Sequence, residues 1–133
     1  MKMKMQIFYA ATVTVIAIFA PTLALAEGWV VKSFFHKTTK ADCINKAADA
    51  FKGIAGTIAR GNNTVYGYDL RKKDNYDAMI LCQRPAGAKA TDVSDIAVVL
   101  VMYDLAATKK STRIRQELKV QIVERYKVSV KNN

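Results

Sequence analysis

The two cysteines are the residues of this chain whose chemistry is most constrained by type and spacing. Cys43 and Cys82 are the only cysteines and lie 39 positions apart. That separation is unlike the Cys-x-x-Cys pairs of redox proteins and zinc sites, so we expect a structural disulfide. Two alternatives stay open. A free Cys43 in the first turn of a helix would have a lowered thiol pKa, and either cysteine could pair between molecules.

The single histidine, His36, is the other residue type suited to catalysis. General-base chemistry needs a nucleophile or a carboxylate within hydrogen-bonding reach, and the sequence places none beside it. A metal site would need partners such as Asp42 or Asp104, and no recognised ligand spacing joins them. The sequence therefore predicts no catalytic residue, no metal ligand and no cofactor. An enzyme whose site is assembled from scattered polar residues remains an alternative.

Positive charge is concentrated near the C-terminus, where only Glu117 and Glu124 oppose a series of lysines and arginines. The predicted binding set for an anionic partner is Lys109, Lys110, Arg113, Arg115 and Lys119. An excess of one charge favours electrostatic association, and the alternative is a helix face that is simply solvated. The expected partner is an anionic envelope component or an acidic protein. The segment shows no aromatic-basic signature of a nucleic-acid-binding fold.

The N-terminus has the organisation of an export signal. Two lysines precede an apolar run, Ile7 to Ala20, which is too short for a typical membrane span, and Ala24 to Ala26 form a small-x-small cleavage site. We expect residues 1–26 to be removed, with an uncleaved membrane anchor as the alternative. The mature chain, residues 27–133, has the length of a single domain and no transmembrane span. We expect it in the periplasm or secreted, where disulfides persist.

Charge counts agree with a basic exported domain. The full chain has 21 Lys and Arg against 11 Asp and Glu, a net charge of +10. Without Lys2 and Lys4 of the signal, 19 cations face 11 anions, a net charge of +8.

The elements that must position these residues follow from periodicity and capping signals. A helix is predicted from Lys40 to Arg60, capped by Thr39 and Asp42 and ended by the residues 61–63. Four strands and a second helix complete the prediction: Gly28 to His36, Thr64 to Leu70, Tyr76 to Cys82, Ile96 to Tyr103, and a helix from Thr108 to about Arg125. A strand within residues 120–131 is the alternative for the end of the chain.

The resulting order, β-α-β-β-β-α, predicts an α+β two-layer sandwich with a four-stranded sheet and both helices on one face. Ile96 to Tyr103 is an unbroken apolar run, which favours a central strand buried on both faces. Tyr76, Ala78, Ile80 and Cys82 share one face of their strand, and a bridge to Cys43 would place the first helix over that face.

Some of these features also occur together in a known pattern. They are Cys43, Ala47-Ala48, Gly67, the strand Tyr76 to Cys82 and the strand Ile96 to Val101. Over about Trp29 to Val101 the chain resembles an uncharacterised family of small exported bacterial α/β proteins with one disulfide. The resemblance implies a one-disulfide α/β domain and carries no activity.

Together these features predict an exported, non-enzymatic accessory or binding protein of the cell envelope, with a basic surface for an anionic partner. A secreted effector or inhibitor that docks on an acidic protein is an alternative. That alternative requires an exposed apolar and aromatic patch beside the charge.

Overall fold

The computed structural model describes residues 30–71, 76–103 and 109–131. The expected signal peptide, residues 1–26, lies outside them. The elements are β1 (Val30–Thr38), α2 (Lys40–Phe51), β2 (Thr57–Arg60), β3 (Thr64–Leu70), β4 (Tyr76–Gln83), β5 (Ser94–Tyr103) and α3 (Lys109–Lys131).

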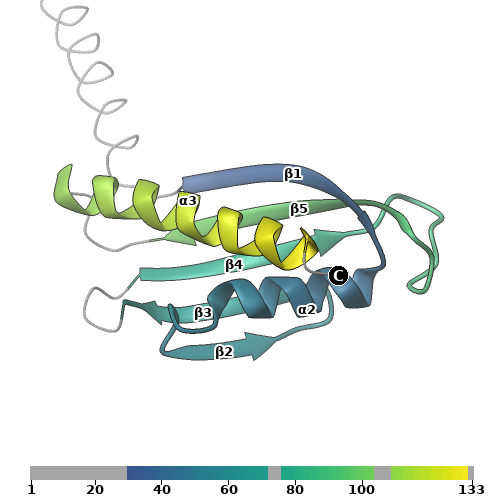
Figure 1. The fold of residues 1–133 in the computed structure, drawn as a ribbon, viewed down its shortest axis with the longest axis horizontal. Coiled ribbons are helices and arrows are strands. Elements are labelled where there is room, and N and C mark those ends of the chain that lie inside the picture. The colour runs from purple at the N-terminus through teal and green to yellow at the C-terminus, as the bar shows by residue number, and fades with distance from the viewer. Residues whose placement is uncertain (1–29, 72–75, 104–108, 132–133) are drawn as a thin grey trace, which may run out of the picture.

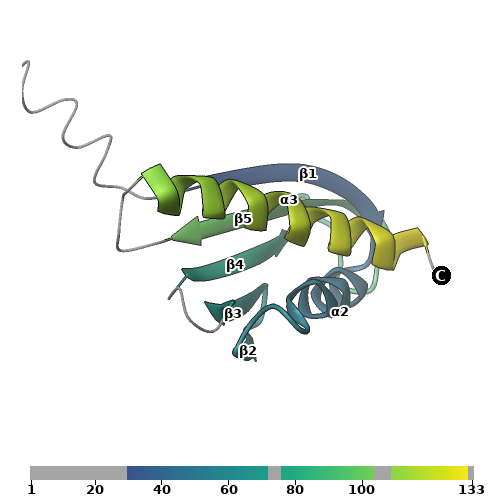
Figure 2. The same ribbon diagram turned by 60° about the vertical axis from the view of Figure 1, so that its left-hand side comes forward.

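The strands form one antiparallel sheet in the order β1-β5-β4-β3-β2. Figures 1 and 2 show both helices on the same side of this sheet, with α3 over β1 and β5 and α2 beside it. The predicted α+β fold with two helices is confirmed. The predicted count of four strands is wrong, because the sheet has five.

The additional strand, β2, lies in the stretch that was predicted as the end of the first helix. The helix instead ends at Phe51, and Gly53 adopts a φ of +78°, which only glycine takes at little cost. The backbone N–H groups of Ile54 and Ala55 both donate to Phe51 O, which closes the turn. Ile54 and Ile58 continue the apolar spacing of the helix in the sequence. In the structure they pack on the same core, but from a turn and from β2. Residues 61–63, predicted to stop the helix, form the β2–β3 turn, where Gly61 N donates to Thr64 O over 2.7 Å.

The start of α2 was predicted correctly from local chemistry. Thr39 is the N-cap, and its Oγ1 accepts a hydrogen bond of 3.2 Å from Asp42 N. The Asp42 carboxylate accepts a hydrogen bond of 2.6 Å from Thr38 Oγ1.

The disulfide is confirmed. Cys43 and Cys82 are bonded, with 6.2 Å between their Cα atoms, and both are fully or almost fully buried. The bridge joins the first turn of α2 to β4. The face of β4 that includes Tyr76, Ala78 and Ile80 is buried under the helices, as the pattern predicted.

The central strand β5 differs from its prediction on one face. Ile96, Val98, Leu100 and Met102 are buried, but the alternating residues Ala97, Val99, Val101 and Tyr103 are only partly covered. The strand is central in the sheet, between β1 and β4, yet the helices form a layer on one side only. Burial on both faces was therefore a wrong prediction.

The C-terminal segment is helical as far as Lys131, so the strand alternative for residues 120–131 is wrong. Leu118, Ile122 and Tyr126 recur at intervals of four and are fully or almost fully buried against the sheet. That stripe extends the helix past Arg125. Tyr126 packs against Phe34 of β1, and Lys46 of α2 binds Ser129 O, so the last turns of α3 are held in place.

Candidate functional site

The predicted cationic set is divided by the fold. Lys110 and Arg113 are exposed and Lys119 is half-buried, whereas Lys109 is described only as the first residue of α3. Arg115 is only 4% exposed and donates from Nη2 to Thr112 Oγ1 over 2.9 Å. It lies in the buried stripe of the helix, so its guanidinium is not part of the outer surface.

Two other cations connect the C-terminal ends of the helices. Arg125, on α3, donates from Nε to Ala50 O over 3.1 Å and from Nη2 to Asp49 O and Lys52 O at the end of α2. Lys46, on α2, is 4% exposed and donates from Nζ to Ser129 O over 2.8 Å near the end of α3. Each helix thus supplies a cation to the carbonyl end of the other, where the helix dipole is negative.

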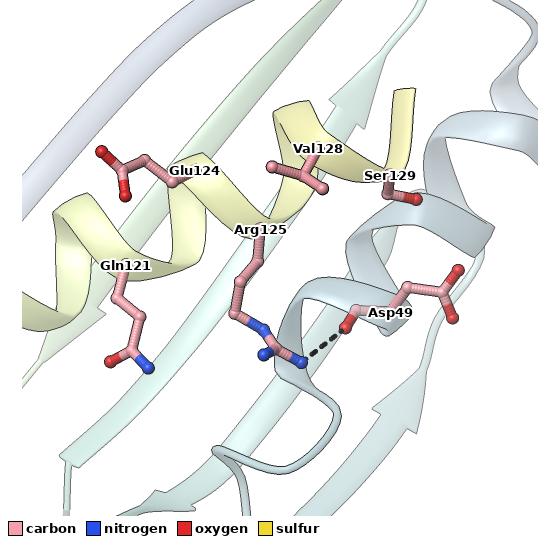
Figure 3. Close-up of a pocket in the computed structure, with 6 residues that line it drawn as sticks. All are labelled: Asp49, Gln121, Glu124, Arg125, Val128 and Ser129. Atoms are coloured by element: carbon pink, nitrogen blue, oxygen red, sulfur yellow. Dashed lines mark hydrogen bonds between the residues drawn. The ribbon is translucent and has the colours of Figure 1, made fainter. Parts of the chain in front are cut away.

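The cleft beside Arg125 is the largest of the described hollows, at about 520 Å³. It lies between the C-terminal halves of the two helices, as Figure 3 shows. Its lining residues are Asp49, Gln121, Glu124, Arg125, Val128 and Ser129. Asp49 forms an ion pair of 2.7 Å with Lys52, and the Arg125 guanidinium is bound to backbone carbonyls. Asp49 and Arg125 of the cleft therefore already have structural partners.

A small polar cluster surrounds His36 between β1 and α3. His36 Nδ1 lies 2.8 Å from the Tyr126 hydroxyl, and the two rings meet edge to face with centroids 5.6 Å apart. Desolvation lowers the pKa of His36; nearby Asp42 raises it and Lys46 lowers it further, each by less. Burial, with a smaller contribution from Asp42, raises the pKa of Tyr126 far above its usual value. Both groups are therefore neutral at pH 7, and the pair fastens β1 to α3.

Neither a metal site nor a membrane-spanning helix is found in the described parts of the chain. No group of three or more His, Cys, Asp or Glu side chains is placed there to hold a metal ion. Likewise, none of the described helices is both long and apolar enough to cross a membrane.

The face of the sheet opposite the helices is the feature that sequence reasoning missed. Its exposed residues include Val31 at 59%, Phe35 at 77% and Tyr68 at 40%. The register places them in continuous rows with apolar residues of the inner strands: Ala97, Val99, Val101, Met79, Leu81 and Tyr66. We call this surface the open face. Alternation within β1 was the available signal, because Val31, Ser33 and Phe35 fall on one side of a strand.

A hollow of about 180 Å³ marks one end of the open face. Its lining includes Tyr66, Tyr68, Met79, Val101 and Tyr103. Tyr66 and Tyr68 are stacked with centroids 6.1 Å apart. This is a shallow aromatic socket whose chemistry suits an apolar or aromatic group.

Comparison with protein-family models, with curated proteins and with solved structures finds no match for this chain. The functional argument therefore depends on the charges, contacts and exposed surfaces described above.

Proposed function

We propose that this protein is exported to the periplasm or secreted, and that it binds an anionic partner through cations of α3 that solvent reaches. The Cys43–Cys82 bridge supports the location, since disulfides persist outside the cytoplasm. The binding residues are Lys110, Arg113 and Lys119, with Lys127 further along the helix.

The observation that carries the proposal is the placement of cations at the start of α3. The first turn of this helix contains Lys110 and no acidic residue, and Arg113 follows in the second turn. A helix N-terminus carries partial positive charge, so lysine there costs about 0.3–1 kcal/mol where a carboxylate would be favourable. An anion that binds there meets side-chain cations and the helix dipole together.

Internal ion pairs leave most of this charge unneutralised. Among the described residues, Lys110, Lys119 and Lys127 form no ion pair. Arg113 approaches Glu117 only at 4.0 Å, and Glu117 is shared with Arg71 at 3.7 Å. Exposed pairs of this kind contribute little, so they leave the arginine available to a partner.

The flank of α3 that faces the sheet edge extends the positive surface. Lys127 Nζ lies 5.1 Å from the ring centre of Phe34 on β1. Lys32 is two positions before Phe34 and lies on the same face of β1. Lys32 and Lys127 are both exposed. The two cations lie along an edge of the sheet where a polyanion or a lipid headgroup region can contact several charges at once.

The test is salt-dependent binding of the exported protein to vesicles containing anionic lipid, compared with vesicles of neutral lipid. The triple variant K110Q/R113Q/K119Q should bind about 100-fold more weakly, because each cation near an anionic membrane contributes about 1 kcal/mol. Its melting temperature should stay the same or rise, since Lys110 opposes the helix dipole. Arg115 is left unchanged because it is buried.

A matched control removes the same charge elsewhere. The variant K40Q/R60Q/K89Q changes residues of α2, β2 and the β4–β5 connection. It should weaken binding much less than the α3 variant. Equal weakening by both variants would mean that net charge alone drives association and would contradict a site on α3. Binding to a soluble acidic polypeptide but not to anionic vesicles would identify the partner as an acidic protein.

A further inference from the structure

The open face is large, apolar and nearly neutral, in contrast to the rest of the molecule. At its regular positions the charged side chains are Lys37, Asp95 and Asp77, which nearly cancel. The full chain has a net charge of +10. The excess cations of the described residues therefore lie on the helical side, at the edges or in the loops, and the open face is where like-charge repulsion opposes association least.

We propose that the open face binds a second copy of this chain, so that two sheets pack face to face in a two-fold dimer. Face-to-face packing of two sheets about 10 Å apart is a standard way to bury one apolar face of each. The helices of both copies then lie on the outside, and the cations of the two α3 helices point away from one another.

The area of the open face is sufficient for such a contact. The open face consists of five strands of 4 to 10 residues each. Strands about 4.8 Å apart, with about 3.3 Å per residue along each, give it an area of roughly 550 Å² per copy. A dimer would bury about 1,100 Å², which exceeds the roughly 1,000 Å² expected of a biological interface and lies in the range of weaker complexes. The expected dimer is therefore reversible and depends on protein concentration.

The open face is also complementary to itself in shape. Phe35 projects from β1 and is 77% exposed, while the tyrosine hollow of about 180 Å³ lies toward the opposite end of the strands. A cavity of about 150 Å³ holds a benzene ring, so the hollow is large enough for an aromatic side chain. In a two-fold dimer whose axis runs obliquely to the strands, in the plane between the two sheets, Phe35 of each copy reaches toward the hollow of the other.

The charged residues at the two ends of the strands are consistent with the same two-fold dimer. Lys37 lies at the end of β1 that pairs with Asp95, and Asp77 lies at the other end of the sheet beside Tyr103. The same oblique axis brings Lys37 of one copy toward Asp77 of its partner. An anionic bilayer fits this face less well, because it would meet two carboxylates and a single lysine.

The test is sedimentation equilibrium of the exported protein, with its disulfide formed, over a wide concentration range. We expect a monomer–dimer equilibrium that high salt does not weaken, since the contact is apolar. Phe35→Glu should raise the dimer Kd at least about 30-fold, as expected when an aromatic residue that fills a pocket of the partner is lost. Tyr68→Glu, on an exposed site of another strand, should do the same and serves if the first variant unfolds. Both variants are first checked for a native melting temperature.

Val120→Glu is the matched control, because Val120 is exposed to 51% on α3, away from the open face. It should leave the dimer Kd unchanged. A wild-type protein that stays monomeric at every concentration would overturn the proposal. So would a dimer that Val120→Glu dissociates and folded Phe35→Glu does not. Phe35-dependent binding of a monomer to neutral vesicles would also overturn it, by assigning the face to lipid. Salt-sensitive binding of anions by α3 is measured separately and can fail without affecting the dimer.

Discussion

Gly67 provides the sharpest test of the packing between α2 and the sheet. It is buried in β3, and a Cβ atom there would lie 2.6, 2.8 and 2.9 Å from Cδ1, Cε1 and Cγ of Phe51. Carbon atoms in contact prefer about 3.5–4.0 Å, so Gly67→Ala requires the ring or the strand to move by about 1 Å. Gly67 is not among the described glycines with positive φ, so the obstacle is the ring and not the backbone conformation.

The expected cost follows from overpacking a closely packed core. Phe51 is fully buried at the end of α2, where it has little room to move. Inserting a methyl group into such a site costs about 1–3 kcal/mol. The lower entropy of the unfolded alanine chain offsets about 0.4–1 kcal/mol. We expect a net loss of about 1–2 kcal/mol, which corresponds to a melting temperature lower by about 4–16 °C.

Urea unfolding followed by circular dichroism measures this loss. Gly61→Ala is the matched control, because its Cβ would meet Thr64 O at 3.4 Å, an ordinary contact, and it should change stability by less than about 1 kcal/mol. Phe51→Leu should relieve the clash, so the double variant should be at least about 1 kcal/mol more stable than the sum of the single effects predicts. Equal effects of Gly67→Ala and Gly61→Ala, or no coupling to Phe51, would refute the packing described here.

Two further predictions concern the disulfide and the histidine. Cys82→Ser should lower the free energy of unfolding by up to about 4 kcal/mol, because the bridge to Cys43 closes a loop with a separation of 39 residues; urea unfolding measures it, and an unchanged midpoint would contradict it. The unfolded chain should bind a proton at His36 more tightly than the native state, since burial lowers the native pKa below 6.5. Stability should therefore fall as pH falls through and below 6.5, and His36→Gln should reduce that slope. Melting temperatures measured above and below pH 6.5 test this, and an equal slope in both proteins would exclude His36 as its source.

The features that the sequence predicted correctly depend on residues close together in the chain or on a strict chemical pairing. Thr39 caps α2 because its hydroxyl reaches an N–H three residues ahead, whatever the rest of the protein does. The alternation in β4 placed Cys82 on the same face as Ile80, and with two cysteines only one internal bridge is available. The spacing of four between Leu118, Ile122 and Tyr126 predicted that this segment is helical for the same local reason.

Other features were decided only when distant segments came together. Ile54 and Ile58 continue the period of a helix, yet they pack on the core from a turn and a strand, because β3 offers β2 a partner for its backbone. An apolar run such as β5 does not reveal whether one layer or two will cover it, so its partly exposed side appeared only with the topology.

The sequence also did not determine which charged side chains are exposed and which are buried. Arg113 and Arg115 are equivalent in a charge count, but the helix turns one to solvent and the other into the buried stripe. Arg125 binds carbonyls at the end of α2, a segment 73 residues or more away. Composition by itself determined that the protein is strongly basic. The tertiary structure decided which cations stabilise the helices and which remain for a partner, because that depends on contacts between elements that are distant in the chain.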